Sequence, residues 1–169
     1  MEKKLDIIEN NNFILDTLSI SKCISRRLKR EFSIMCKLYQ KVYVELTQKS
    51  NEICVNVYDF GISYKFTIGI NYPFVCPTVF LNNHKYKQIL ANKTNYEITY
   101  LKKLTGIDCL CCNSLTCSEK WAPNNNLNDI INEIKYFKKI KRDLVFKIIT
   151  DKIKEKYLNS DIDLISWLF

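Results

Sequence analysis

Glycine and proline are scarce in this sequence, with three residues of each among 169. Flexible linkers are rich in glycine and serine and stiff ones in proline, so no long linker is expected. The start, Met1–Asp6, is not followed by an apolar core, because acidic and asparagine residues interrupt it by Asn10. We therefore expect neither a secretion signal nor a membrane span, and a cytoplasmic or nuclear protein.

The bulk composition is that of a globular protein, with 47% apolar and 26% charged residues. A chain of this length is sufficient for one domain with one sizeable core. The formal net charge of +8 is compatible with an acidic partner. However, the charges are dispersed, and on the basic face at residues 22–30 no aromatic residues interleave with them as a stacking platform for bases requires. Nucleic-acid binding is therefore disfavoured, and a solvated basic surface is the simpler interpretation.

The first half of the chain has clear periodicity. Apolar residues recur every three or four positions between Ser21 and Leu38, which predicts a helix. Alternating apolar and polar residues predict three strands, at 42–47, 53–58 and 64–70. Their short polar connections favour an antiparallel meander, and a short fourth strand is expected at 78–81.

The second half is less regular. Residues 82–106 are polar and show no regular pattern, so we predict irregular structure there. One helix is expected to begin near Asn126 and another to cover Arg142 to Tyr157. The sequence thus predicts an α+β domain at 20–157, after a lead-in at 1–19. An apolar terminal segment, 158–169, is expected to pack on the domain or to contact a partner.

Eight cysteines are present, and without a secretion signal a disulfide framework is not expected. Four of them lie within apolar patterns and are predicted to be buried free thiols. These are Cys23, Cys36, Cys54 and Cys76.

The other four cysteines are Cys109, Cys111, Cys112 and Cys117. Cys109 and Cys112 have the Cys-x-x-Cys spacing that binds zinc, to which Cys117 and the only histidine, His84, could add ligands. No second such pair exists, so our leading prediction includes neither a metal nor a cofactor. A chance cluster of buried thiols is a further alternative, and His84 is expected to be a solvent-exposed spectator.

Two short motifs flank these cysteines. Tyr72-Pro73-Phe74-Val75-Cys76-Pro77 follows the predicted meander, and Trp121-Ala122-Pro123 follows the cysteines. In this order they resemble the ubiquitin-conjugating enzymes, over roughly residues 20–157. The resemblance implies a four-stranded antiparallel meander flanked by an N-terminal helix and C-terminal helices. Divergent copies occur in large DNA viruses, and this chain looks like one of them, which implies the cytoplasm or nucleus of a host cell.

The resemblance also implies a thioester relay. A cysteine accepts ubiquitin or a related modifier from an activating enzyme and passes it to a lysine, usually with a ligase, since a thiolate is a strong nucleophile. Cys112 fits the spacing to Trp121 and ranks first. Cys109 ranks second, because Gly106 and Leu110 stand where the family often has these residues, and Cys111 ranks third.

One departure from the family concerns catalysis. Its His-Pro-Asn motif, whose asparagine stabilises the oxyanion, is replaced by Lys87-Gln88-Ile89. Asn92 or Asn95 are alternative donors. The loss leaves two other functions open: a catalytically inactive variant that acts as a binding module, and a zinc-stiffened interaction domain.

Candidate partner-binding residues also follow from the resemblance. The resemblance implies that basic residues on the predicted first helix dock the activating enzyme. It also implies that residues in two loops contact a ligase. These residues are Arg26, Arg27, Lys29 and Arg30 on the helix, and Phe74, Pro123 and Asn124 in the loops. A solvated helix face and loop packing against the sheet are the alternatives. Trp121 is expected in the core.

Overall fold

The computed structural model of the protein describes residues 22–47, 52–91 and 94–158. Its centre is one antiparallel sheet whose strands follow chain order, β1 to β5. The strands are β1 Lys41–Thr47, β2 Glu52–Asp59, β3 Ile62–Ile68, β4 Thr78–Leu81 and β5 His84–Lys85. The α+β class and the meander are confirmed, but the sheet has five strands rather than the four expected.

Tight turns explain the meander. Phe60 and Gly61 between β2 and β3 both have positive φ, at 45° and 76°, as a two-residue hairpin turn requires. Asn82 and Asn83 repeat this geometry after β4, with φ of 48° and 66°. Asparagine tolerates this region better than most residues, so the chain reverses there and adds the short β5. This second turn is the physical reason for the fifth strand.

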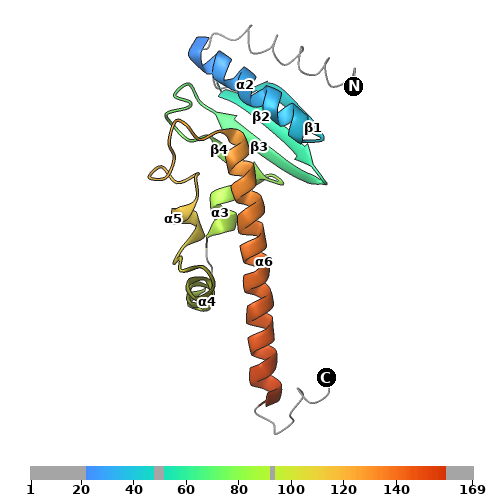
Figure 1. The fold of residues 1–169 in the computed structure, drawn as a ribbon, viewed down its shortest axis with the longest axis vertical. Coiled ribbons are helices and arrows are strands. Elements are labelled where there is room, and N and C mark those ends of the chain that lie inside the picture. Colours follow the sequence, from blue (N-terminus) through green and yellow to red (C-terminus); the bar gives the residue numbers. More distant parts are fainter. Residues whose placement is uncertain (1–21, 48–51, 92–93, 159–169) are drawn as a thin grey trace.

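Helix α2, Lys22–Leu38, crosses the sheet (Figure 1). Its buried face includes Leu28, Phe32 and Met35, as the periodicity predicted. Cys23 was expected to be buried but is exposed, because it lies one position, or about 100° of helix rotation, before the buried Ile24.

All eight cysteines are free thiols, as expected. Cys36 and Cys54 are buried, which confirms the prediction for these two, and Cys76 is half-buried.

The prediction of irregular structure at 82–106 was wrong. This stretch contains α3, Tyr86–Leu90, and α4, Asn95–Thr105. A capping box starts α4: Thr94 Oγ1 accepts from the Glu97 amide, and the Glu97 carboxylate accepts from the Thr94 amide. Gly106 ends the helix with φ of 72°. The Thr-x-x-Glu signal and the glycine were readable in the sequence.

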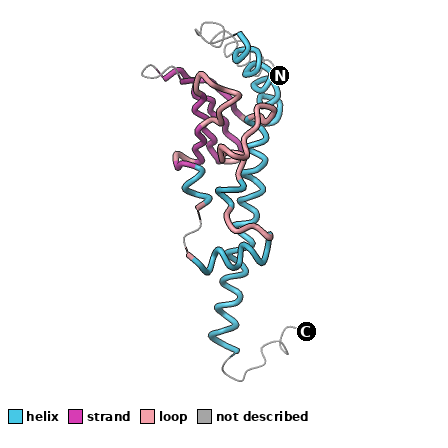
Figure 2. Tube along the Cα trace, turned by 90° about the vertical axis from the view of Figure 1, so that its left-hand side faces the viewer, coloured by secondary structure: helices cyan, strands magenta, loops and turns pink. Residues whose placement is uncertain are grey.

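The two C-terminal helices that the sequence predicted form a single helix, α6, Leu127–Leu158. Residues 138–141 include neither glycine nor proline, so nothing interrupts the backbone hydrogen bonds there. The first half of α6 packs against the core through buried residues such as Ile130 and Ile134. The second half extends past the sheet, with α4 beside its middle (Figures 1 and 2).

Within the described ranges, no helix combines the length and the hydropathy that crossing a bilayer requires. The expected lead-in at 1–19 lies outside the described residues, as does 159–169 of the expected terminal segment.

Candidate functional site

Three of the four clustered cysteines meet in space. Cys109 precedes the short helix α5, Leu110–Asn113, which contains Cys111 and Cys112. The three sulfur atoms all lie within 4.8 Å of one another, and those of Cys111 and Cys112 are 3.9 Å apart. Cys112 is exposed, and the other two are half-buried. We call these three residues the thiol cluster.

The backbone of the thiol cluster is fixed on both sides. Leu110 is fully buried, so α5 has one side chain in the core while its sulfur atoms stay near the surface. The Asn113 side-chain amide donates to the Cys109 carbonyl oxygen at 3.0 Å. Immediately after it, the Ser114 hydroxyl and the Leu115 amide donate to the Glu133 carboxylate at 2.6 and 2.5 Å.

Glu133 lies on α6 and is the anchor for this segment. Tyr86 on α3 donates to the same carboxylate, with 3.4 Å between the oxygen atoms. Burial raises the pKa of Glu133 above its usual value, although these three donors act in the opposite direction. One carboxylate thus connects α3, α6 and the residues that follow the thiol cluster.

The three thiols differ in acidity. Partial burial opposes ionisation of Cys109, but interactions with the thiols and backbone amides of Cys111 and Cys112 lower its pKa below the ordinary value. The hydrogen bond with Cys109 and partial burial raise the pKa of Cys111 to about 12. The Cys109 sulfur likewise raises the pKa of Cys112. The three thiols therefore interact strongly, and the Cys109 thiolate is the one that its neighbours stabilise.

The two sequence motifs are in direct contact. The indole nitrogen of Trp121 donates to the Pro73 carbonyl oxygen at 2.7 Å. The ring centroids of Trp121 and Tyr72 are 6.2 Å apart. Trp121 is buried, which confirms the prediction that it belongs to the core.

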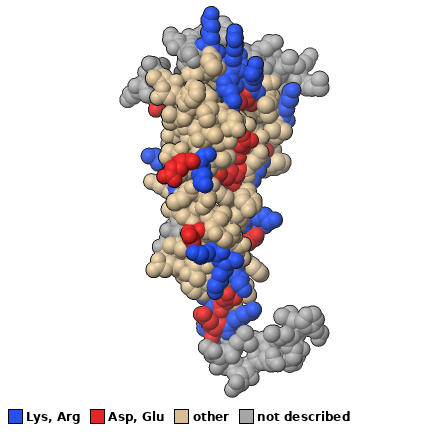
Figure 3. Space-filling model, turned by 60° about the vertical axis from the view of Figure 1, so that its left-hand side comes forward, with Lys and Arg blue, Asp and Glu red and all other residues tan. Residues whose placement is uncertain are grey.

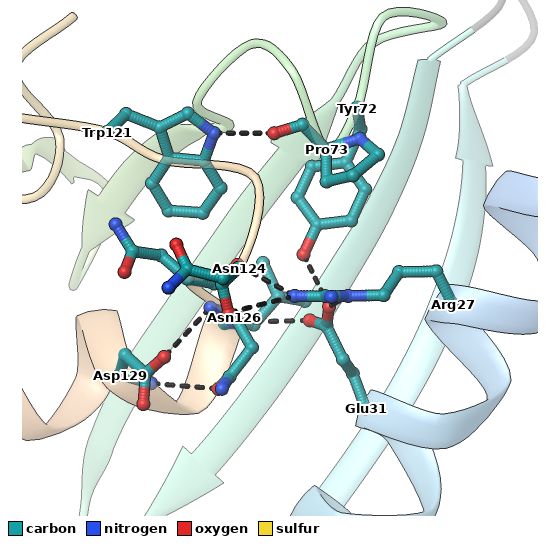
Figure 4. Close-up of polar contacts among 10 residues, drawn as sticks. Arg27, Glu31, Tyr72, Pro73, Trp121, Asn124, Asn126 and Asp129 are labelled. Atoms are coloured by element: carbon teal, nitrogen blue, oxygen red, sulfur yellow. Dashed lines mark hydrogen bonds and ion pairs between the residues drawn. The ribbon is translucent and has the colours of Figure 1, made fainter.

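A buried carboxylate ties this contact to both long helices (Figure 4). Glu31 on α2 accepts from the Tyr72 hydroxyl at 2.7 Å and from the Leu127 amide, at the start of α6, at 3.0 Å. It also forms an ion pair with Arg27, whose guanidinium donates to the Asn125 carbonyl oxygen at 2.8 Å. Burial, followed by the Glu31 charge, raises the pKa of Tyr72, so its hydroxyl remains a donor. We call Arg27, Glu31, Tyr72 and Leu127 the polar junction.

A cavity of about 400 Å³ lies beside Trp121. Phe74, Cys76, Lys87 and Thr116 contribute to its walls. Burial raises the pKa of Cys76 to about 12, so this thiol is a poor nucleophile. Lys87 and Gln88, which the sequence resemblance aligns with the His-Pro-Asn motif of the ubiquitin-conjugating enzymes, are exposed on α3.

The candidate partner residues fall into two groups. Arg26, Arg30, Phe74, Pro123 and Asn124 are exposed, and Lys29 is half-buried. In the view of Figure 3, basic side chains gather at the end of the molecule where α2 lies. Arg27 differs from them, because its guanidinium is engaged in the polar junction.

Two residues of the alternative zinc set are outside the thiol cluster. Over the described residues, the group of potential metal ligands within 4.8 Å contains the thiol cluster but neither Cys117 nor His84. His84 is exposed as expected, although it lies in β5 rather than in a loop.

Sequence reasoning missed Glu31, Glu133 and Asn113. Glu31 had a readable signal, because it lies three positions after Leu28 and four before Met35, on the apolar face of its helix. Glu133 occurs between the apolar positions of α6, and nothing local distinguishes it from the other charged residues of that helix.

Fold and site together define an α+β protein with a surface thiol cluster attached to a five-stranded meander. Comparison with protein-family models, with curated proteins and with solved structures found no match to this chain.

Proposed function

We propose that the protein is a ubiquitin-conjugating-like carrier, which accepts ubiquitin or a related modifier as a cysteine thioester and passes it to a lysine. The observation that supports this most is the exposed Cys112 thiol, on a backbone fixed by Leu110 and Glu133. Cys112 is the first candidate acceptor and Cys109 the second. The proposed setting is the cytoplasm or nucleus of a host cell infected by a large DNA virus.

The proposed reaction has two acyl transfers. In the first, the acceptor thiolate attacks the thioester carbonyl between the modifier and a cysteine of the activating enzyme. A new carbon–sulfur bond forms, and the enzyme's cysteine leaves as a thiolate that takes up a proton. In the second, a neutral lysine amine attacks the new thioester. An isopeptide bond forms, the amine loses a proton, and the acceptor thiol is regenerated.

Asn113 offers a replacement for the missing asparagine donor. Its side-chain amide follows Cys112 directly and has two N–H groups, one of which donates to the Cys109 carbonyl oxygen. The second N–H is the proposed donor to the oxyanion that forms during transfer. On this proposal, Asn113→Ala loads the modifier normally but discharges it to lysine about a hundredfold more slowly, since one oxyanion donor is lost.

Surface chemistry supports separate partner sites. We propose that Arg26 and Arg30 on α2 contact an acidic surface of the activating enzyme. Phe74 is 77% exposed and borders the cavity beside Trp121, so it is the apolar residue proposed to contact a ligase. Arg27 is omitted from this surface because the polar junction occupies its guanidinium.

The test is a loading assay in the presence of a chelator selective for thiophilic metal ions, with Mg²⁺ in excess for the ATP. The full chain is incubated with activating enzyme, ATP and labelled ubiquitin or a related modifier, and the products are separated with and without reductant. We expect a reductant-labile adduct that is retained in Cys23→Ser, an exposed thiol far from α5 in the sequence. The adduct is lost in Cys112→Ser if Cys112 is the acceptor, or in Cys109→Ser if Cys109 is. No adduct with any modifier refutes the proposal.

The exposed Lys87 and Gln88 in place of His-Pro-Asn favour a second candidate, an inactive variant that binds the modifier or a ligase. This binding module predicts chemical-shift changes in labelled ubiquitin on mixing, without any adduct. Phe74→Ser would weaken such binding if the apolar surface beside Trp121 is used.

A further inference from the structure

We propose that the thiol cluster is a binding site for a thiophilic metal ion, Zn²⁺ in the first instance, with Cys109, Cys111 and Cys112 as its three ligands. The spacing of the sulfur atoms is the first support. With metal–sulfur bonds of about 2.3 Å in a tetrahedral arrangement, neighbouring sulfurs stand about 3.8 Å apart. The Cys111 and Cys112 sulfurs are 3.9 Å apart, and all three lie within 4.8 Å. An ion therefore needs only small side-chain rotations.

The surroundings of the thiol cluster are the second support. Leu110 and Ser114, on either side of Cys111 and Cys112, are fully buried and fix the backbone of this turn. The exposed Cys112 gives an ion a path from solvent. Because the backbone is fixed and the sulfur atoms already lie together, the entropic cost of ordering the ligands on metal binding is low.

The ligand chemistry selects the class of ion. Three thiolates favour soft or borderline ions such as Zn²⁺ and Cu⁺, whereas Mg²⁺ and Ca²⁺ prefer oxygen ligands. Neither Cys117 nor His84 belongs to the group of close ligand atoms among the described residues. The three thiols therefore leave the fourth position of a tetrahedral ion to a further ligand, such as water.

Metal binding and acyl loading would compete for the same sulfurs. A thiolate that is bonded to Zn²⁺ cannot attack a thioester, so the ion would block loading and a chelator would restore it. This regulatory consequence rests on the proposed function. The metal site itself rests only on the geometry of the three thiols.

The test measures metal binding directly. The full chain, reduced and freed of metal by a chelator that is then removed, is titrated with Co²⁺ while thiolate-to-cobalt charge-transfer absorption is recorded. Zn²⁺ is then added to displace the cobalt. We expect one ion per chain. Each of Cys109→Ser, Cys111→Ser and Cys112→Ser should weaken binding at least tenfold, about the loss that even indirect partners of a ligand cause.

Cys23→Ser is the matched control, because Cys23 is an exposed thiol outside the thiol cluster. Circular dichroism shows whether each variant retains the fold. No charge-transfer band in the wild-type chain, or equal weakening by Cys23→Ser, overturns the proposal.

The two proposals fail in distinguishable ways. Metal binding without any adduct in chelator-treated protein refutes the carrier function and leaves the metal site. An adduct without metal binding refutes the metal site and leaves the carrier function.

Discussion

Removing the Glu31 carboxylate should destabilise the protein more than any exposed substitution on the same helix. Glu31 is only 5% exposed and joins α2 to Tyr72 and to the start of α6. Glu31→Ala leaves three donors without their acceptor, on Arg27, Tyr72 and Leu127.

The size of the effect follows from burial. Breaking one side of a buried ion pair costs about 3–5 kcal/mol. The Arg27 side chain is 28% exposed and regains some hydration, so we expect the lower end, about 3 kcal/mol. For a chain of this size that corresponds to a fall in Tm of about 6–12 °C.

Urea and thermal unfolding of the full chain provide the measurement. Arg30→Ala is the control, because Arg30 is exposed on the same helix and its loss should change the free energy of unfolding by less than about 0.5 kcal/mol. Tyr72→Phe removes one donor and should cost about 1 kcal/mol. In the Glu31→Ala background it should cost measurably less, since the acceptor is already gone. A loss below about 1 kcal/mol for Glu31→Ala, or strict additivity with Tyr72→Phe, would contradict a role for this carboxylate as the centre of the polar junction.

Three further predictions concern other contacts. Trp121→Phe loses the donor to Pro73 and part of a buried ring, so the free energy of unfolding should fall by about 2 kcal/mol; an unchanged unfolding curve would show that the indole contact is not needed. Thr94→Ala removes the cap of α4 and should lower the local stability of this helix by about 1 kcal/mol. Amide exchange should therefore become faster in α4 but not in β2. Cys76 should resist alkylation at pH 8 under conditions that modify Cys112, because burial raises its pKa to about 12; equal labelling in the folded chain would contradict this. Since the unfolded Cys76 thiol ionises near pH 9, its contribution to stability is complete below that pH and declines as the pH rises towards 12.

Much of the secondary structure could be predicted, but two predictions were wrong: the two C-terminal helices and the irregular structure at 82–106. The apolar pattern of α6 changes after Phe137, which suggested two helices, yet the backbone continues because no helix-breaking residue interrupts it. Residues 82–106 looked irregular because polar residues dominate them. A capping box and a terminal glycine define α4 better than its weak apolar pattern does.

The candidate site was predicted in part. The sequence identified the cysteines before Trp121 as candidate site residues, but it did not predict which of the four sulfur atoms lie close together. The structure brings Cys109, Cys111 and Cys112 together, whereas Cys117 lies outside the group. The turn of α5 decides this, because it directs three sulfurs to one side while Leu110 enters the core.

By itself, the sequence determined the elements whose causes are local. Helix α2 and strands β1 to β3 follow from apolar periods of 3.6 and 2, and the Asp59-Phe60-Gly61 turn follows from its composition. Local patterns report which face of an element is buried, and little else.

Only the tertiary structure decided which partners the internal polar groups meet. Arg27 looks like its exposed neighbours Arg26 and Arg30, but its partners include Asn125, 98 positions away. Glu31 meets the Leu127 amide across 96 positions, and Trp121 meets Pro73 across 48. Such contacts arise from the packing of helices on the sheet, and no local period in the sequence records them.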